Sequence, residues 1–328
     1  MRAMTGRTRW GILGTGRVAG RFTEDLRLLP DAEVVAVGSR THDAAQAFAT
    51  RHGIGRAHGS WAALAADPEV DVVYVATPHA VHRAAATTCL EAGKAVLCEK
   101  PCTLDRATSA ELVDLARERG LFLMEAMWTR CNPAVRRMCD LVTEGAIGEV
   151  AAVVADFGFA APPDPADRLR ARALGGGALL EMGVYPITIA HLVLGAPAHI
   201  RAWAALSGDG VDENTGMVFG YDTGALATLS CGLLGGTPNT ASITGTRGRI
   251  TLPRPCHRPS GLVLDRDGAA PEEIALPFEG NGYQFEAAEV HRCLHEGLVE
   301  SPLVSHATTL EVMGVLDAIR AQIGVTYP

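Results

Sequence analysis

The chain has 328 residues, enough for two domains at about 150 residues each, and its 48% apolar and 20% charged residues are ordinary for a globular protein. Its 29 basic and 37 acidic side chains give a net charge of −8, which disfavours nucleic acids and anionic membrane surfaces as partners. No apolar run approaches the roughly 18 residues that span a bilayer, and no signal peptide precedes the first strand-like run, so we expect a cytoplasmic protein without a membrane partner.

The first 125 residues alternate short apolar runs with longer segments whose apolar residues recur every three or four positions. The expected strands are residues 10–13, 33–38, 71–76, 95–98 and 121–124, and the expected helices are 17–28, 42–51, 79–91 and 104–119. Strands separated by helices of this length imply βαβ crossovers. The sequence therefore predicts a doubly wound parallel sheet that is covered on both faces.

The pattern changes after about residue 128. A helix is expected at 133–144, a strand at 149–159 and a Pro- and Asp-rich connection at 160–167, followed by a helix after the triple glycine 175–177. Further strands are expected at 200–206, 215–221, 225–233, 240–244, 249–252, 261–264 and 273–276, with hairpin loops at 222–224 and 246–248 and closing helices at 283–296 and 305–323. The fold class is α/β, with a doubly wound domain at 1–127 and an α+β domain at 128–328 that has a large, open-faced, mainly antiparallel sheet.

A glycine-rich turn follows the first strand and opens the first helix. Its sequence is Gly14-Thr15-Gly16-Arg17-Val18-Ala19. Gly14 permits a tight turn, Gly16 lets the backbone approach a pyrophosphate, and Ala19 is small enough for close helix–strand packing. The helix N-terminus supplies free N–H groups for the anion. The alternative is a glycine-rich turn without a ligand, but the strand before and the helix after it favour a dinucleotide site.

The end of the second strand indicates which dinucleotide binds. NAD sites usually place a carboxylate there, whereas this chain has Gly38-Ser39-Arg40-Thr41 and no carboxylate before Asp43. Arg40 can pair with a 2′-phosphate, and Ser39 can donate a hydrogen bond to it. We therefore expect NADP, with NAD as the alternative cofactor, unless Arg40 is simply a solvated surface residue.

Two more strand ends carry polar residues where ligands bind in open α/β sheets. The third predicted strand ends in Thr77-Pro78-His79 and the fourth in Glu99-Lys100-Pro101. Because proline cannot continue a central strand, it ends the strand and fixes the preceding residue. Lys100 could then donate hydrogen bonds to a substrate oxygen and stabilise developing charge. An exposed lysine at the start of a loop is an equally good interpretation at this point.

In the second half, Glu181 and Tyr185 lie four residues apart, so on a helix they share one face. A phenol near a cation and a carboxylate is a plausible proton donor or acceptor for an alcohol/ketone pair. The alternative makes Glu181 a solvated helix residue and Tyr185 a core aromatic.

Taken together, these motifs resemble a known family over essentially the whole chain. The order is Gly14-x-Gly16-x-x-Ala19, Thr77-Pro78-His79, Glu99-Lys100-Pro101 and the glycine-rich segment ending in Glu181 and Tyr185. This order resembles the glucose–fructose oxidoreductase/inositol dehydrogenase (Gfo/Idh/MocA) family. Residues 124–130 and Tyr185 look most like the branch of dimeric dihydrodiol dehydrogenases and NADP-dependent xylose dehydrogenases.

The resemblance implies a Rossmann domain, an open-faced sheet domain and oxidation or reduction of a sugar-like or cyclic trans-diol substrate. It makes Lys100 the lysine of the family's E-K-P motif, which is often followed by a cis peptide, and gives Glu99 a structural or cofactor-side role. Many relatives carry Asp and His where Glu181 and Tyr185 stand, which leaves the role of Glu181 less defined.

The resemblance also implies cofactor-side positions outside these motifs. His79 resembles a position along the nicotinamide ribose, and the nearby His82 is assigned either to the same region or to helix packing or solvent. Trp128 and Arg130 follow the last strand of the first domain and are expected to contact cofactor or substrate. Their alternative is a hinge aromatic followed by a surface arginine.

Two functions from different classes remain. In an NADP(H)-dependent oxidoreductase, Lys100 would polarise the reacting oxygen, Tyr185 would exchange the hydroxyl proton, and Glu181 would orient or charge-balance them. In a regulatory protein on the same scaffold the cofactor would bind without turnover, but intact Lys100 and Tyr185 favour the enzyme.

The open-faced sheet predicts a homodimer, or a dimer of dimers, through the second domain. The histidines and cysteines have no metal-ligand spacing, so no metal is expected, and the eight cysteines are expected to be reduced.

Overall fold

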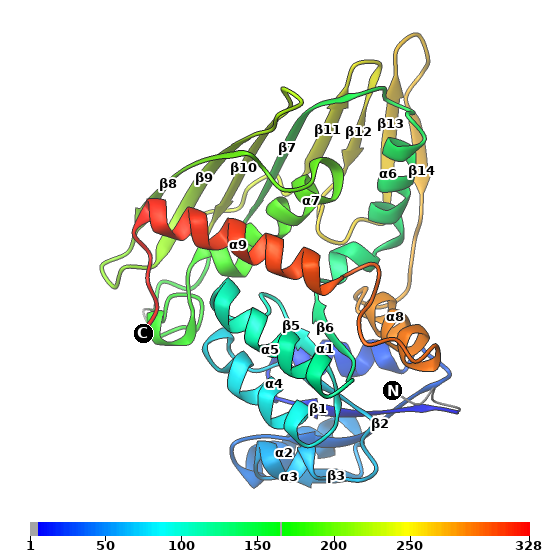
Figure 1. Cartoon of the computed structure of the whole chain (residues 1–328), viewed down its shortest axis with the longest axis vertical. Helices are drawn as coiled ribbons and strands as arrows, with labels where there is room; N and C mark the ends of the chain where they lie inside the picture. Colours follow the sequence, from blue (N-terminus) through cyan, green and yellow to red (C-terminus); the bar gives the residue numbers. More distant parts are fainter. Residues whose placement is uncertain (1–5, 165) are drawn as a thin grey trace. The chain divides into compact units, whose positions relative to one another are not determined.

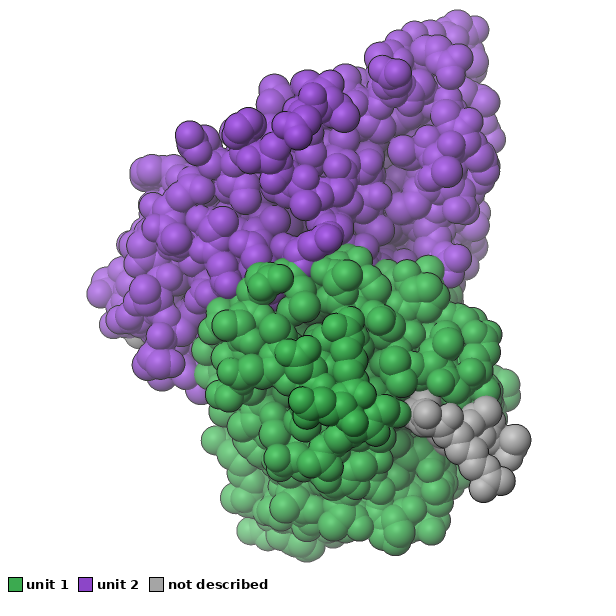
Figure 2. Space-filling model, in the orientation of Figure 1, with its two compact units in different colours: residues 1–128, 279–310 green, residues 129–278, 311–328 purple. Residues whose placement is uncertain are grey.

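The structure, a computed structural model, describes residues 6–164 and 166–328 and contains two compact units (Figures 1 and 2). Unit 1 comprises the described residues up to Trp128 together with Glu279–Leu310, and unit 2 comprises Thr129–Phe278 and Glu311–Pro328. The predicted division into 1–127 and 128–328 runs along the chain without interruption. The structural units instead interleave, because residues 279–310 return to unit 1.

Unit 1 contains a six-stranded parallel sheet in the order β3-β2-β1-β4-β5-β6, which is the order of a dinucleotide-binding doubly wound fold. Its elements are β1 (Thr8–Leu13), α1 (Arg17–Leu26), β2 (Ala32–Gly38), α2 (His42–His52), β3 (Arg56–His58), α3 (Trp61–Ala65), β4 (Val72–Val75), η1 (His79–Val81), α4 (His82–Glu91), β5 (Ala95–Glu99), α5 (Arg106–Glu118), β6 (Leu123–Ala126), η2 (Trp128–Cys131, which crosses into unit 2) and α8 (Gln284–His295). The predicted strands and helices of the first half are confirmed, except that the helix expected at 79–91 begins as the separate turn η1. The sequence patterns do not predict β3 and α3.

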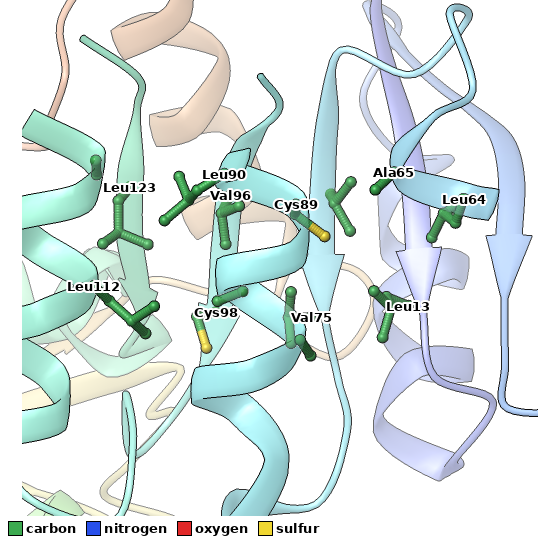
Figure 3. Packing of buried hydrophobic residues seen from close by; sticks show 14 of the residues in the cluster. Leu13, Leu64, Ala65, Val75, Cys89, Leu90, Val96, Cys98, Leu112 and Leu123 are labelled. Carbon is green, nitrogen blue, oxygen red and sulfur yellow. The ribbon is translucent and has the colours of Figure 1, made fainter. Parts of the chain in front are cut away.

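The core of unit 1 explains why its central strands lack the polar alternation of a half-exposed sheet. Every residue of β4 and β5 is buried. Figure 3 shows Val75 and Val96 on these strands packed with Leu90 and Leu112 from the covering helices. Fully burying one such side chain contributes about 1.5–3 kcal/mol. A sheet covered on both faces therefore requires apolar residues at every position of its central strands.

Residues 279–310 belong to unit 1 because polar groups of α1 and β1 bind them. The Asp25 carboxylate on α1 accepts hydrogen bonds from the backbone N–H groups of Asn281 (3.0 Å) and Tyr283 (2.9 Å). Trp10 on β1 donates its indole N–H to His291 Nε2 on α8 at 2.9 Å. These contacts join residues more than 250 positions apart, so local sequence patterns cannot reveal them.

Unit 2 contains an eight-stranded sheet in the order β14-β13-β12-β11-β7-β10-β9-β8, antiparallel except for the parallel pair β7 and β10. Its elements are α6 (Pro133–Thr143), β7 (Val150–Gly158), η3 (Arg172–Leu174), η4 (Leu179–Gly183), α7 (Val184–Leu194), β8 (His199–Leu206), β9 (Asp212–Gly220), β10 (Leu226–Gly232), β11 (Ala241–Gly245), β12 (Gly248–Leu252), β13 (Gly261–Arg266), β14 (Glu272–Ala275) and the last part of α9 (His306–Ile323). The predicted mainly antiparallel sheet and both hairpins are confirmed.

Helices α6 and α7 pack on one face of this sheet (Figure 1). Residues such as Val153 and Leu229 are buried on the covered face together with their register partners Ala227 and Ala155, while their neighbours in sequence point to the other face. On that other face Val154, Val218 and Trp203 are 56%, 45% and 73% exposed. The second sheet thus leaves apolar side chains uncovered within a single chain.

One apolar stretch, Arg172–Leu194, has the length and composition of a membrane-spanning helix. Most of it is buried inside the protein, because α7 packs against β7 and β10. Its hydrophobicity is therefore accounted for by the interior of unit 2.

Candidate functional site

The glycine turn after β1 uses its two glycines for different reasons. Gly14 has φ +118°, and a Cβ there would lie 2.5 Å from the carbonyl oxygen of Ala76, so no larger residue fits. Gly16 precedes α1, and a Cβ there would meet no described atom within 4 Å. Space is therefore left directly above the first turn of α1, as the sequence predicts for a bound pyrophosphate.

The groups around this space fit a dinucleotide. No side chain caps the N-terminus of α1, so its first N–H groups point toward the open side of Gly16. The hydroxyl of Thr77, at the end of β4, is buried and finds no hydrogen-bond partner within the described ranges. Its backbone nitrogen would lie 3.5 Å from a Cβ at Gly14, so Thr77 adjoins the same turn. A cofactor would be held here by the backbone of residues 14–18 and by the Thr77 hydroxyl.

The residues at the end of β2 that are predicted to bind the ribose differ in burial. Gly38 is buried, Ser39 is half-buried and Arg40 is exposed. Thr41 caps α2, accepting a hydrogen bond from the Ala44 N–H at 3.4 Å. The carboxylate that an NAD site would usually carry is absent from Gly38 to Thr41 in the sequence.

Lys100 follows β5 immediately and is buried, with 8% of its surface exposed. Its backbone N–H donates to Oε2 of Glu99 at 3.1 Å, and the Tyr74 hydroxyl on β4 donates to Oε1 of the same carboxylate. The Lys100–Pro101 peptide is cis, as the family resemblance implies. Glu99 therefore fixes the backbone of the lysine, while its expected structural or cofactor-side role stays a prediction.

The turn after Lys100 is held from two further directions. The Glu125 carboxylate accepts the Cys102 N–H at 2.9 Å and the Thr309 hydroxyl at 3.0 Å. The His82 ring lies 3.0 Å from the Pro101 carbonyl oxygen through Nδ1, and its Nε2 lies 2.8 Å from another main-chain carbonyl oxygen. These contacts fix the position of the main chain that carries the lysine.

His82 has this structural contact rather than the solvent-exposed position that the sequence left open. Its ring is completely buried, and Nε2 approaches the carbonyl oxygen of Thr77. Burial, together with the charges of His79 and Lys100, lowers its pKa to about 4. A neutral ring can donate only one of the two hydrogen bonds at a time. His82 therefore links the ends of β4 and β5, while His79 is buried with its ring 5.5 Å from that of His82.

Lysine is rare in this chain, since only Lys94 and Lys100 are lysines among the 29 basic residues. Lys94 donates from Nζ to the carbonyl oxygens of Asp67 (2.7 Å) and Val70 (2.8 Å), a structural role. All the other basic residues among these 29 are arginines. A compact ammonium kept at position 100 is consistent with a chemical role that a planar guanidinium does not match.

Trp128 and Arg130 are both buried, so the alternative of a surface arginine at 130 is excluded. The Trp128 ring stacks on Tyr283, with centroids 4.3 Å apart. Arg130 lies in unit 2, where its Nη2 is 3.2 Å from Nδ1 of His191. The predicted contact of these two residues with cofactor or substrate stays a prediction.

In unit 2, Glu181 and Tyr185 lie on two consecutive helical segments. Glu181 belongs to η4, a π-helical turn, and Tyr185 to the first turn of α7. The buried Asp212 carboxylate holds the start of η4 by accepting the Leu179 N–H at 2.7 Å. Gly177 is required just before it, because φ there is +121° and a Cβ would lie 2.4 Å from Asp212 Oδ1. The wider turn replaces the regular helix that the sequence predicts here.

Two neighbours of Tyr185 were not anticipated. Its ring lies 5.3 Å from that of Phe157 on β7 and 5.2 Å from that of His257 in the loop after β12, between centroids. Phe157 and His257 stack on each other at 4.3 Å. Phe157 lies in a strand whose alternating pattern could have placed it on the helix-covered face, whereas nothing in the local sequence around His257 indicates this contact.

Glu181 pairs with an arginine that the sequence reading did not single out. Arg168 donates from Nη1 and Nη2 to the two carboxylate oxygens, at 3.1 and 2.9 Å. The predicted site residues thus form two groups. Unit 1 brings together the glycine turn, the end of β2, Thr77 and Lys100 at the carboxyl ends of its strands, and unit 2 brings Glu181 and Tyr185 close to Arg168 and the Phe157/His257 pair.

Across residues 6–164 and 166–328, no group of three or more His, Cys, Asp or Glu side chains is arranged to hold a metal ion. All eight cysteines are free thiols.

Comparison with known proteins shows the family of the chain. Residues 8–127 match the oxidoreductase family with an NAD-binding Rossmann fold, and residues 135–251 match the GFO/IDH/MocA C-terminal domain. The trans-1,2-dihydrobenzene-1,2-diol dehydrogenases of Sus scrofa and Homo sapiens are each 38% identical to the chain, with 98% of both partners covered.

Two solved structures illustrate the shared fold. The 3-ketoreductase KijD10 from Actinomadura kijaniata, in complex with NADP and TDP-benzene, has a TM-score of 0.86 at 31% identity over 97% of this chain and 98% of its own. An aldose-aldose oxidoreductase from Caulobacter crescentus, complexed with glycerol, has a TM-score of 0.87 at 24% identity over 96% and 97%. At that identity the second likeness concerns the fold alone.

Proposed function

Because the chain belongs to the Gfo/Idh/MocA oxidoreductase family, we propose that it is an NADP(H)-dependent enzyme that interconverts a secondary alcohol and a ketone of a sugar-like or cyclic trans-diol substrate. The observation that carries this proposal is the buried Lys100, fixed by Glu99 at the same edge of the sheet as the glycine turn. Relatives named as dihydrodiol dehydrogenases, and a 3-ketoreductase bound to NADP, support the substrate class and cofactor.

Each residue has a distinct part in the proposed reaction. NADP, when bound, accepts or supplies the hydride. The Lys100 ammonium donates a hydrogen bond to the reacting oxygen and stabilises the negative charge that develops on it. The Tyr185 hydroxyl exchanges the proton of the substrate hydroxyl, and Glu181 orients or charge-balances the group. His79, Trp128 and Arg130 are assigned to the cofactor and substrate surfaces around them.

The experiment mixes purified protein with NADP and a panel of aldoses, sugar derivatives and cyclic trans-diols, and follows the absorbance of the reduced nicotinamide. Turnover of at least one class of substrate is expected. Tight cofactor binding without turnover of any member would favour the second candidate, a cofactor-binding regulatory protein. The buried lysine argues for the enzyme, since a sensor gains nothing from a buried cation there.

The preference for NADP over NAD is assigned to Arg40. Replacing it with alanine removes a charged hydrogen bond to the 2′-phosphate, worth about 1.5–3 kcal/mol, and is expected to weaken NADP binding about tenfold to a hundredfold. NAD binding should stay unchanged. Both are measured by nucleotide titration with fluorescence detection. Arg51→Ala, at an exposed arginine on α2, serves as the control, and equal weakening of both cofactors by Arg40→Ala would contradict the assignment.

We further propose that two chains associate through the uncovered face of the second sheet. Val154 and Val218 both lie opposite Thr228 in the strand register, so they form a continuous row with it, and Leu226 is 53% exposed on the same strand as Thr228. An apolar row of this kind marks an interface, and a twofold axis would place the row of one protomer against that of its partner.

Replacing Trp203 on this face with glutamate is expected to weaken self-association by roughly 30-fold or more, because aromatic residues dominate such interfaces. Sedimentation equilibrium at micromolar concentration should show a dimer for the wild type and a monomer for the variant. Leu28→Glu introduces the same charge at an exposed leucine of unit 1 and should leave the dimer intact. A wild-type monomer at micromolar concentration would overturn the proposal.

A further inference from the structure

Residues 166–174, here called the arginine segment, come directly before the triple glycine and contain three arginines. Each of them binds an acceptor elsewhere in unit 2: Arg168 binds Glu181, Arg170 binds Glu213, and Arg172 binds Thr326. The segment also donates and accepts backbone hydrogen bonds, such as that from the Gly177 N–H to the Leu169 carbonyl at 2.8 Å. The segment is therefore held to the rest of unit 2 by several hydrogen bonds.

Arg168 differs from Arg170 and Arg172 because its partner, Glu181, is a candidate site residue. Glu213 is the second residue of β9 and Thr326 lies near the C-terminus, whereas Glu181 lies four residues before Tyr185. The guanidinium meets the carboxylate with two roughly parallel N–H···O contacts of 2.9 and 3.1 Å, one to each oxygen. Such a two-point pair fixes direction as well as distance.

Building on the proposed function, we propose that Arg168 is a positioning residue for the reaction, and that Glu181 serves as its anchor rather than as a proton donor or acceptor. Through this pair the arginine segment holds the π-helical turn η4, and with it the start of α7 that carries Tyr185.

The geometry supports this division of roles. Each oxygen of Glu181 accepts one guanidinium N–H, so Arg168 sets the orientation of this carboxylate. The start of η4 is held by Asp212 through the Leu179 N–H, so Arg168 supplies the second fixed point of this turn. Two contacts of this turn, one at Leu179 and one at Glu181, therefore set the position of Tyr185.

The test compares Arg168→Gln, Glu181→Gln and the charge-exchanged double variant R168E/E181R. Each single variant is expected to lower kcat for the best sugar or diol substrate about tenfold to a hundredfold, as displacement of a catalytic group does. The KM for NADP and the shape of the pH profile should stay unchanged. The double variant restores the pair with reversed charges and should recover kcat to within about threefold of the wild type.

Two results would overturn the proposal: a double variant as impaired as Glu181→Gln, or the loss of one limb of the pH profile in Glu181→Gln. Arg168→Lys checks the two-point contact without reversing any charge. An ammonium keeps the charge but cannot make both parallel contacts, so this variant should behave like Arg168→Gln. Wild-type kcat in Arg168→Lys would contradict the proposal even if the double variant failed to fold.

Hydrogen–deuterium exchange separates this proposal from the proposed function. If the wild type turns over no substrate in the panel, the proposed function has failed. The contribution of the Arg168–Glu181 pair to the structure can still be measured from the exchange rates of amides 166–183. Faster exchange in both single variants, restored in the double variant, is the expected result. Unchanged exchange in the single variants would count against the pair. Arg266→Gln, which opens an exposed ion pair with Glu272 on β13 and β14, is the matched control and should change neither kcat nor these amides.

Discussion

Replacing Lys100 with methionine is expected to lower turnover by about a hundredfold to ten thousandfold, while NADP binding stays within a few-fold of the wild-type value. Methionine is unbranched and of similar length, so it fills the same buried space without the cation. The backbone at this position is fixed by Glu99 and by the contacts around Pro101, which the substitution leaves in place. Absorbance of the reduced nicotinamide measures turnover, and fluorescence titration measures cofactor binding.

Lys94→Met provides a matched control, because Lys94 is the only other lysine in the chain. Its ammonium donates to two main-chain carbonyl oxygens, so its loss should lower the thermal stability of unit 1 but not the turnover of the folded protein. With only two lysine side chains, acetylation read by mass spectrometry also reports on each of them separately. A Lys100→Met variant that retains more than a tenth of wild-type turnover would overturn the role assigned to the cation.

Replacing Glu286 with glutamine is expected to remove a loss of stability that begins as the pH rises above about 4.5. Glu286 lies on α8, is completely buried, and has no hydrogen-bond partner for either carboxyl oxygen among the residues that the structure describes. Burial, reinforced by the negative charges of Glu99 and Asp25, raises its pKa well above the usual range. The folded protein therefore keeps a proton that the unfolded chain releases above about pH 4.5.

The direction in which the free energy of unfolding changes with pH follows from this difference in bound protons. As the pH rises above 4.5, unfolding releases the proton of Glu286, so the free energy of unfolding falls by about 1.4 kcal/mol per pH unit until the folded protein releases it too. Glutamine is neutral at every pH, so the stability of the variant relative to the wild type should rise as the pH increases above about 4.5, until the folded wild type releases its proton too. Denaturant unfolding at a series of pH values measures this difference, and parallel curves for the two proteins would contradict the expectation.

Glu289, one turn further along α8, has its pKa shifted in the opposite direction, so its effect on stability has the opposite pH dependence and it serves as the control. Burial alone would raise its pKa, but hydrogen bonds from Arg292 and Ser301 outweigh burial and lower it. Its ionised form therefore stabilises the folded state above about pH 4.5, and that contribution is lost as the pH falls through the lowered pKa. Glu289→Gln should be less stable than the wild type at neutral pH, with the difference shrinking in acid.

The sequence by itself determined the architecture of both halves. The alternation of apolar runs and helical periodicity predicts the parallel sheet, and the Gly14/Gly16 turn and the prolines after Thr77 and Lys100 indicate where ligands would bind. These features depend on neighbours within about ten positions, so periodicity and turn chemistry express them directly. The strand β3, with three residues, is too short to show any period.

Only the tertiary structure decided how distant segments combine. The return of residues 279–310 to unit 1, the buried Glu286 behind Glu99, and the contact of His257 with Tyr185 all depend on chain segments far apart in sequence. The pairing of Arg168 with Glu181 spans a loop whose path no pattern predicts. Such contacts arise when packing brings distant segments of the chain together. Local sequence patterns depend only on neighbouring residues, so they cannot predict these contacts.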